Sequence, residues 1–138
     1  MFKKIFLSLF IASYMYASHY DTGIEFYKNK DFKKAAEQFK KSADDANAEA
    51  AYILGYLYTG GIGVKANLKQ SLKWYERAAV QGHTNAQINL GFMYIAGHGT
   101  KLDYTKAAHW IAKAKASGNE KAKVMWNEFK LYDYENKK

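Results

Sequence analysis

The chain matches itself when it is shifted along its own sequence by 36 residues. The positions that coincide hold leucine, glycine and aromatic residues: Leu54 and Leu90, Gly55 and Gly91, Tyr58 and Tyr94, Gly61 and Gly97, Gly63 and Gly99, Trp74 and Trp110, Gly82 and Gly118. A fixed period of this size is typical of a stack of supersecondary units rather than of one closed globule. The question of function therefore becomes what the stack holds.

Each 36-residue unit contains two helical patterns. In the first, apolar residues recur about one turn apart along one face, as at Ala50, Leu54 and Tyr58, which predicts an amphipathic helix. The second pattern follows a residue that suits a helix N-cap. These cap residues are 36 positions apart: Asp31, Asn67 and Asp103. The sequence thus predicts helix pairs and an all-α fold.

Two glycines, Gly55 and Gly91, lie in the middle of the predicted first helices. Glycine in a helix interior is less favourable than alanine by about 1 kcal/mol. Its recurrence at the same place predicts a close approach between helices, where a side chain would clash. Gly61 and Gly97 follow the same helices, where glycine supplies the positive φ of a helix C-cap.

The repeat divides the chain into consecutive segments: 1–18, a first unit with a short loop at 19–47, two full units at 48–83 and 84–119, and a capping helix and tail at 120–138. The capping helix is expected from Glu120 to about Tyr132. Trp126 stands there in the place of the repeated leucine, and Asn127 in the place of the glycine. Loss of the glycine indicates a terminal cap that needs no further neighbour. Three helix pairs and a cap meet the minimum of about three units for a stable stack.

Residues 1–18 have the pattern of a secretory signal peptide, with two lysines, an uncharged apolar run at 5–16 and small residues after it. The run is shorter than the roughly 20 residues that span a bilayer comfortably. Cleavage after Ala17 or Ser18 would place Met15 or Tyr16 at the −3 position, and neither is small. An uncleaved membrane anchor is therefore the alternative. We expect a periplasmic or secreted protein.

The composition excludes several kinds of chemistry. The chain has no cysteine, which excludes disulfides, thiolate catalysis and cysteine-ligated metals. The net charge is +8, or +6 once the segment 1–18 is left out, since 19 basic and 13 acidic residues remain. These lysines are spread over the helices, which favours a solvated surface, with nonspecific binding to anionic surfaces as the alternative. We expect no nucleic-acid partner, because export would separate the protein from nucleic acid.

The two full units, AAYILGYLYTGGIGVKANLKQSLKWYERAAVQG and AQINLGFMYIAGHGTKLDYTKAAHWIAKAKASG, resemble Sel1-like repeat proteins, a branch of the tetratricopeptide superfamily. The family pattern has L-G-x-x-Y, then G-x-G-V, then K-A-x-x-W and K-A-A. The resemblance covers residues 20–130. It implies a right-handed α-solenoid of tetratricopeptide-like helix pairs that serves as an adaptor or scaffold, and it implies no reaction.

A cysteine-rich, secreted branch of this family, from bacteria related to Helicobacter, is described as penicillin-binding or β-lactamase-like. The resemblance therefore leaves a weak enzyme of that kind as the alternative function. That branch pairs cysteines eight residues apart across neighbouring helices. The corresponding positions in this chain hold other residues: Ala43 and Ala51, Ala79 and Gln87, Lys115 and Lys123.

The sequence lacks the patterns that such catalysis requires. No serine is followed by lysine three positions on, as a serine β-lactamase needs. The four histidines, His19, His83, His98 and His109, lack the close spacing of zinc ligands, and His83 and His98 fall in predicted surface loops. We therefore expect no catalytic residue, no metal and no cofactor.

Candidate partner-binding residues lie at the variable positions of the first helices, which line the concave face in tetratricopeptide-type stacks. They are Tyr52, Tyr56, Ile88, Asn89, Phe92 and Glu128. An aromatic and aliphatic stripe with polar residues beside it suits an extended peptide or a partner helix. The alternative is that several of these side chains close the core between units. The sequence predicts a protein or peptide partner, and it leaves the partner's identity and the oligomeric state open.

Overall fold

The computed structural model describes residues 19–137, where all regular secondary structure is helical. Residues 19–28 are helical and are followed by α2 (Phe32–Asp44), α3 (Ala48–Gly60), α4 (Leu68–Val80), α5 (Thr84–Ala96), α6 (Tyr104–Ala116), α7 (Glu120–Glu128) and the short 3-10 helix η1 (Leu131–Asp133). The predicted signal segment, residues 1–18, lies outside this range. None of the helices within the range has the length and hydrophobicity needed to cross a bilayer.

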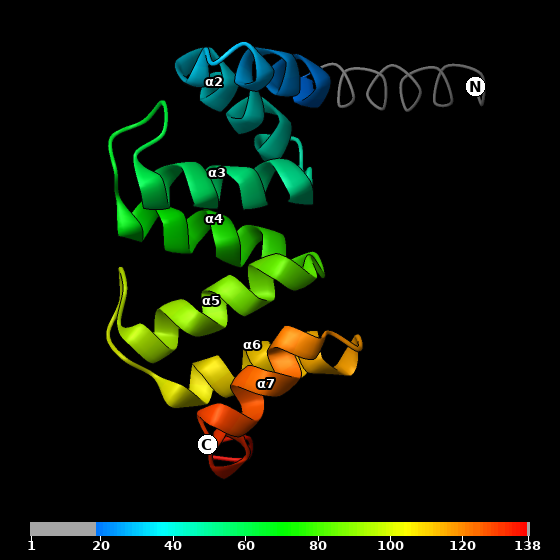
Figure 1. Ribbon diagram of the computed structural model, residues 1–138, viewed down its shortest axis with the longest axis vertical. Coiled ribbons are helices and arrows are strands. Elements are labelled where there is room, and N and C mark those ends of the chain that lie inside the picture. Colours follow the sequence, from blue (N-terminus) through cyan, green and yellow to red (C-terminus); the bar gives the residue numbers. More distant parts are fainter. Residues whose placement is uncertain (1–18, 138) are drawn as a thin grey trace, which may run out of the picture.

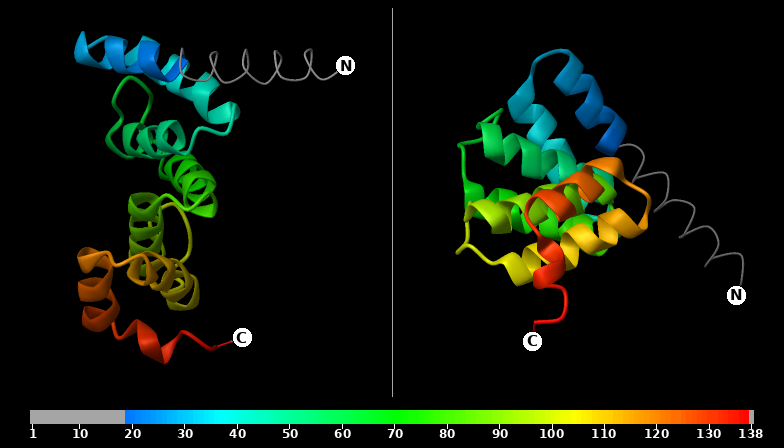
Figure 2. Two further views of the ribbon diagram at one scale, coloured as in Figure 1. Left: turned by 90° about the vertical axis from the view of Figure 1, so that its right-hand side faces the viewer. Right: turned by 60° about the horizontal axis from the view of Figure 1, so that its bottom comes forward.

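The helices form an α-solenoid, as the sequence predicts. Each helix packs against the next along the chain, most extensively within the pairs α3–α4 and α5–α6, and the pairs follow one another down the stack (Figure 1). In the left view of Figure 2, α3, α5 and α7 form one layer on the left, and α4 and α6 form a second layer to their right. First helices therefore share one face of the molecule.

Side-chain caps fix where the helices begin. The predicted caps are confirmed: the Asn67 side chain accepts a hydrogen bond from the Gln70 backbone N–H at 3.0 Å, and Asp103 accepts one from Lys106 at 2.9 Å. Asp31 caps α2 in the same way. The first helices have caps of their own, again 36 residues apart: Asn47, His83 and Asn119. Each cap satisfies a backbone donor that the first turn leaves without a partner.

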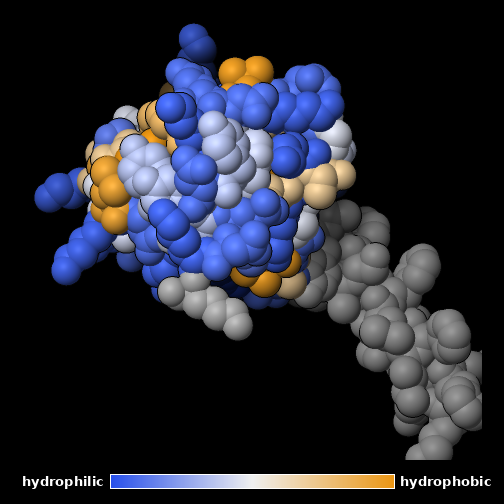
Figure 3. Space-filling model, turned by 90° about the horizontal axis from the view of Figure 1, so that it is seen from below, coloured by the Kyte–Doolittle hydropathy of each residue, from blue (hydrophilic) through white to orange (hydrophobic). Residues whose placement is uncertain are grey.

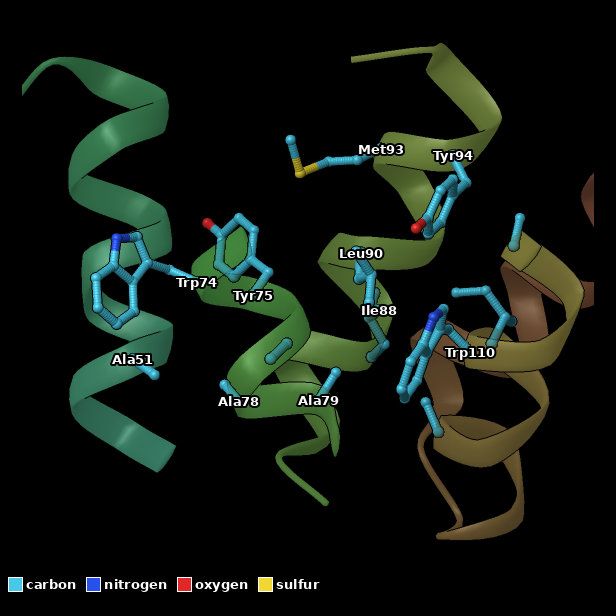
Figure 4. Packing of buried hydrophobic residues seen from close by; sticks show 14 of the residues in the cluster. Ala51, Trp74, Tyr75, Ala78, Ala79, Ile88, Leu90, Met93, Tyr94 and Trp110 are labelled. Carbon is cyan, nitrogen blue, oxygen red and sulfur yellow. The ribbon is translucent and has the colours of Figure 1, made fainter. Parts of the chain in front are cut away.

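The core consists of large aromatic side chains from one helix set against alanines from the next. Trp74 lies across α3 near Ala51, and Ala79 of α4 lies beside Ile88 of α5 (Figure 4). Trp74 is 4% exposed and Ala51 is fully buried. Burying an aromatic side chain of this size contributes about 2 to 3 kcal/mol, and alanine lets the helix axes come close enough for it to bridge them.

The close approach expected at the mid-helix glycines is confirmed. A Cβ atom on Gly55 would lie 2.5 Å from the Tyr75 ring, and one on Gly91 would lie 2.6 Å from the Ile111 side chain. Real Cβ atoms essentially never come so near another heavy atom. The hydrogen atom of glycine thus sets the spacing between the two helices of each pair.

The long loop of each unit rests on the unit before it. Gly63 has a φ of 71°, and a Cβ there would lie 2.2 Å from the Phe32 carbonyl oxygen at the start of α2. Gly99, with a φ of 70°, approaches the Leu68 carbonyl oxygen at the start of α4 in the same way, at 2.4 Å. Both positions need glycine for its backbone conformation and for its missing side chain.

Arg77 braces two second helices against each other. Its guanidinium donates to the Ala43 carbonyl oxygen at 2.9 Å and to the Asp44 carboxylate at 3.1 Å, at the C-terminal end of α2. The same guanidinium lies 4.7 Å from the centre of the Trp74 ring. A cation at this end also complements the helix dipole of α2. Hydrogen bonding to Lys40, reinforced by Arg77, holds the pKa of Asp44 below its usual value.

The C-terminal cap differs from the prediction, because α7 ends at Glu128 and does not continue to Tyr132. Lys130 adopts a left-handed conformation with a φ of 49°, which ends the helix and turns Leu131 inward, where it is fully buried. Tyr134 then stacks on Tyr104 of α6, with ring centres 5.1 Å apart. Seen from this end, apolar surface appears in separate spots among hydrophilic residues, as a terminal cap requires (Figure 3).

Replacing Gly91 with leucine should destabilise the fold by about 3 kcal/mol, because the new side chain overpacks the crossing of α5 with α6. The melting temperature should fall by about 10 °C. Ala96→Leu, at an exposed position near the end of the same helix, is the matched control and should leave the melting temperature nearly unchanged. Equal melting curves for the two variants would place the crossing elsewhere.

Ala46 carries backbone strain that its counterparts avoid. Its φ is 67°, and the residues 36 and 72 positions later, Gly82 and Gly118, have φ values of 89° and 85°. A left-handed residue with a side chain is disfavoured by about 1 to 2 kcal/mol. Ala46→Gly should therefore raise the free energy of unfolding by about 0.5 kcal/mol or more, after the added flexibility of the unfolded chain is subtracted.

Gly82→Ala provides the mirror experiment. A Cβ at Gly82 would meet no other atom within 4 Å, so the substitution isolates the backbone effect and should lower stability by a similar amount. Urea unfolding measures the free energy of unfolding of both variants. A loss of stability in Ala46→Gly would contradict the assignment of strain.

Candidate binding groove

Two aromatic side chains stand out from the face formed by α3, α5 and α7. Tyr56 on α3 is 49% exposed and Phe92 on α5 is 46% exposed, and they occupy equivalent positions 36 residues apart. Glu128 on α7 is also exposed, whereas Tyr52 and Asn89 are half-buried. The structure thus brings the predicted residues to neighbouring helices of one layer.

Ile88 does not have the exposure that the sequence analysis expects. Its side chain is 2% exposed and lies beside Ala79 of α4 (Figure 4). It closes the interface between two units, which was the alternative for residues of this stripe. Ile88 forms part of the floor of the face and does not project from it.

A hollow of about 390 Å³ lies between α5 and α7. Its lining is mainly apolar with polar groups at the rim: Ile88, Asn89, Phe92, Lys121, Met125, Glu128 and Phe129. Four of these seven were predicted from the sequence. The other three, Lys121, Met125 and Phe129, lie on or next to α7, where the sequence analysis names Glu128 as the candidate residue. Met125 follows Asn89 by 36 residues, so the repeat itself would have found it.

A second hollow, of about 190 Å³, lies on the other side of α5, next to α3 and α4. Its lining includes Asn89, Phe92, Tyr75 and His98, so Asn89 and Phe92 are shared by both hollows. Burial raises the pKa of the Tyr75 hydroxyl, and the neighbouring Thr59 and Asn89 side chains offset part of that rise. The two hollows together form a surface that we call the groove, with Asn89 and Phe92 on the ridge between them.

Tyr52 is held in place by His83 at the start of α5. The two rings stack with centres 4.5 Å apart and an angle of 19° between their planes. The His83 Nδ1 accepts from the Ala86 backbone N–H at 3.2 Å, and Nε2 lies 2.8 Å from a Glu49 carboxylate oxygen. Nδ1 must be unprotonated to accept, so Nε2 carries the hydrogen atom and donates a hydrogen bond to the Glu49 carboxylate. His83 is thus a helix cap, where the sequence predicts only a surface loop residue.

Two serines of the helices lie in the core of the fold. Ser42 and Ser71 are fully buried, and the Ser71 hydroxyl donates to the Gly55 carbonyl oxygen at 2.8 Å, next to the glycine crossing. In the part of the chain that the structure describes, no three histidine or acidic side chains come together in a way that could hold a metal ion.

The repeat, the glycine crossings and the solenoid have a counterpart among known families. The Sel1 repeat model matches residues 11–47, 48–83 and 84–119. This chain belongs to the Sel1 repeat family. Proteins of this kind generally mediate protein–protein interactions. A comparison with curated proteins gives no match for this Sel1 repeat protein.

Solved structures with the same fold are similar along most of the Sel1 repeat chain. A Sel1 repeat protein from Oxalobacter formigenes has 31% identity and a TM-score of 0.77, covering 85% of this chain and 92% of its own. The protective antigen c5321 of uropathogenic Escherichia coli has 31% identity and a TM-score of 0.74. The match covers 78% of this chain and 24% of c5321, so the chain corresponds to about a quarter of that protein.

The cysteine-rich protein B of Helicobacter pylori (hcpB) is also similar, with a TM-score of 0.69, covering 86% of this chain and 94% of its own. Its identity of 22% shows a shared fold alone. Ala79 and Gln87 occupy the second pair of positions where the resemblance to the cysteine-rich branch implies a disulfide. In this chain the Gln87 side-chain amide instead donates a hydrogen bond to the Ala79 carbonyl oxygen at 3.2 Å.

Proposed function

We propose that this Sel1 repeat protein is a non-catalytic scaffold that binds an extended peptide segment of a partner protein in its groove. Sel1 repeat proteins generally act as protein-interaction scaffolds. The observation that supports peptide binding in the groove is the ridge of Asn89 and Phe92 between the two hollows, with Tyr56 exposed on the neighbouring helix.

The lining of the groove specifies the chemistry of that segment. The hollow between α5 and α7 is walled by Phe92, Met125 and Phe129, so it accepts a large apolar side chain. Buried aromatic and aliphatic anchors in such pockets supply most of the binding energy in protein interfaces. The methionine suits this role because its flexible side chain adapts to different shapes.

Polar groups at the rim suit the backbone of an extended peptide. The Asn89 amide can donate and accept a hydrogen bond, as a backbone unit of a bound strand requires. Lys121 and Glu128, both on α7, place opposite charges on the wall of the same hollow. Because their charges balance, the groove favours a segment with an apolar anchor and little net charge.

We also propose that the protein acts in the bacterial cell envelope, in the periplasm or outside the cell. The support is the basic start, apolar run and small residues of segment 1–18. N-terminal sequencing of the protein isolated from the periplasm should find a start near Ser18 or His19. An intact Met1 terminus in the membrane fraction would instead show an anchored form.

The double variant Tyr56→Ala/Phe92→Ala tests the groove. Peptides selected against the full chain from a random display library should share a large apolar residue. The variant should bind them at least about tenfold more weakly, because Phe92 lines both hollows and Tyr56 offers an exposed aromatic contact on the neighbouring helix. Fluorescence anisotropy of labelled peptides measures the affinity, and circular dichroism checks that the helices are intact.

The matched control is Val80→Ala/Tyr132→Ala, which removes side chains that are 70% and 52% exposed and line neither hollow. It should bind the selected peptides like the unmodified chain. Equal affinities for the groove variant and this control would reject the assignment of the groove.

A further inference from the structure

The loops between the first and second helices of the units lie on one side of the stack. Figure 1 and the right view of Figure 2 show the two long loops, after α3 and after α5, one above the other on the left of the molecule. Gly63 and Gly99 hold each of them against the start of the second helix in the preceding unit. We call this side the loop edge and define it as residues 28–34, 59–70 and 95–106.

The sequence analysis expects lysines spread over the helices, but the net positive charge of the described chain falls on the loop edge. The edge has eight lysines and two acidic residues, Asp31 and Asp103, which gives a net charge of +6. The other described residues have ten basic and eleven acidic side chains, a net of −1. The lysines of the edge are all exposed: Lys28, Lys30, Lys33, Lys34, Lys65, Lys69, Lys101 and Lys106.

These lysines are not explained by ion pairs within the fold. Among the described residues, Lys34 with Asp31 is the one salt bridge on the edge. Both aspartates cap helices with their side chains. Lys33 and Lys69 lie in the first turns of α2 and α4, which contain no acidic residue. A cation at a helix N-terminus opposes the helix dipole, so their position is unfavourable for the isolated protein.

Apolar side chains project from the same edge. Leu102 is 58% exposed and Leu68 is 38% exposed, each next to a lysine in the sequence. Ile62 and Val64 of the first long loop are partly buried against the core, so the loop backbone is fixed from within. The edge thus presents two exposed leucines among its eight lysines.

We propose that the loop edge docks on the anionic surface of a lipid bilayer. Lysines attract the phosphates of anionic lipids over a distance set by the ionic strength. Exposed leucines among them enter the interface between headgroups and acyl chains, as in other surfaces that lie on membranes. An acidic protein segment would satisfy the lysines, but it would leave the leucines without an apolar environment.

This orientation leaves the larger hollow accessible. The hollow between α5 and α7 is lined by no residue of the loop edge. The stack would then lie with its loops on the membrane and hold its peptide away from it. The smaller hollow, in contrast, shares Thr59, Leu68 and His98 with the loop edge. Peptide binding in the larger hollow is therefore the part of the groove that can be tested separately from docking.

Vesicle sedimentation with the full chain tests the proposal. Vesicles of phosphatidylcholine with about 30% phosphatidylglycerol are compared with vesicles of phosphatidylcholine alone. The variant Lys69→Glu/Lys101→Glu should bind the anionic vesicles about tenfold more weakly or worse, because each substitution reverses a charge at the membrane. Its melting temperature should be unchanged or higher, since a carboxylate in the first turn of α4 interacts favourably with the helix dipole.

Lys41→Glu/Lys130→Glu, which makes the same charge change away from the edge, should keep nearly all of the binding. The apolar segment at 5–16 and the two lysines before it are present in every variant, so differences between variants report the edge. The groove variant Tyr56→Ala/Phe92→Ala should bind vesicles normally, which separates failure of this proposal from failure of the peptide-binding one.

Leu102→Ser distinguishes a membrane from a soluble acidic partner. It should weaken binding to the anionic vesicles and leave binding to soluble polyglutamate unchanged. Equal binding of the edge variant and the control lysine variant to anionic vesicles would contradict the proposal. So would a normal affinity of Leu102→Ser for anionic vesicles, together with polyglutamate binding to the protein as tightly as those vesicles do. The second result would identify the edge as a site for acidic protein segments.

Discussion

The crossing of two helices at a glycine is the constraint on which the rest of the structure depends. At Gly55 and Gly91 the hydrogen atom in place of a side chain lets Tyr75 and Ile111 lie directly on the neighbouring backbone. This contact fixes the distance between the two layers of the solenoid. The aromatic and alanine residues of the core then fit that distance, and the first helices are held in one layer. The groove is the outer surface of that layer.

The features that recur with the period could be predicted from the sequence. Helix starts at Asn67 and Asp103 and the close approach at Gly91 follow from residues whose roles are local or are repeated in every unit. Residues without a repeated partner were harder to place. Ile88 belongs to the same stripe as Tyr56, but its burial depends on Ala79 of another helix, which the spacing of one helix does not reveal.

Two other differences have the same origin. His83 can cap α5 because Tyr52 and Glu49 of α3 hold its ring in one orientation, although histidine is not among the preferred caps. The end of α7 depends on Lys130 adopting a left-handed conformation so that Leu131 reaches the core. Both are tertiary effects that outweigh local preference. The outline of the groove was predictable from the repeat, whereas its depth was not.

The loops that rest on the preceding unit have a consequence for how such chains lengthen. Gly63 and Gly99 each let the long loop of one 36-residue unit rest on the unit before it, and the surface that they contact is backbone at a helix start. A tandem duplication of one such segment would therefore bring its own joint and find a matching seat already present. Growth by whole units needs no compensating change elsewhere, which makes the length of the stack easy to vary by gene duplication while the fold of each unit stays constant.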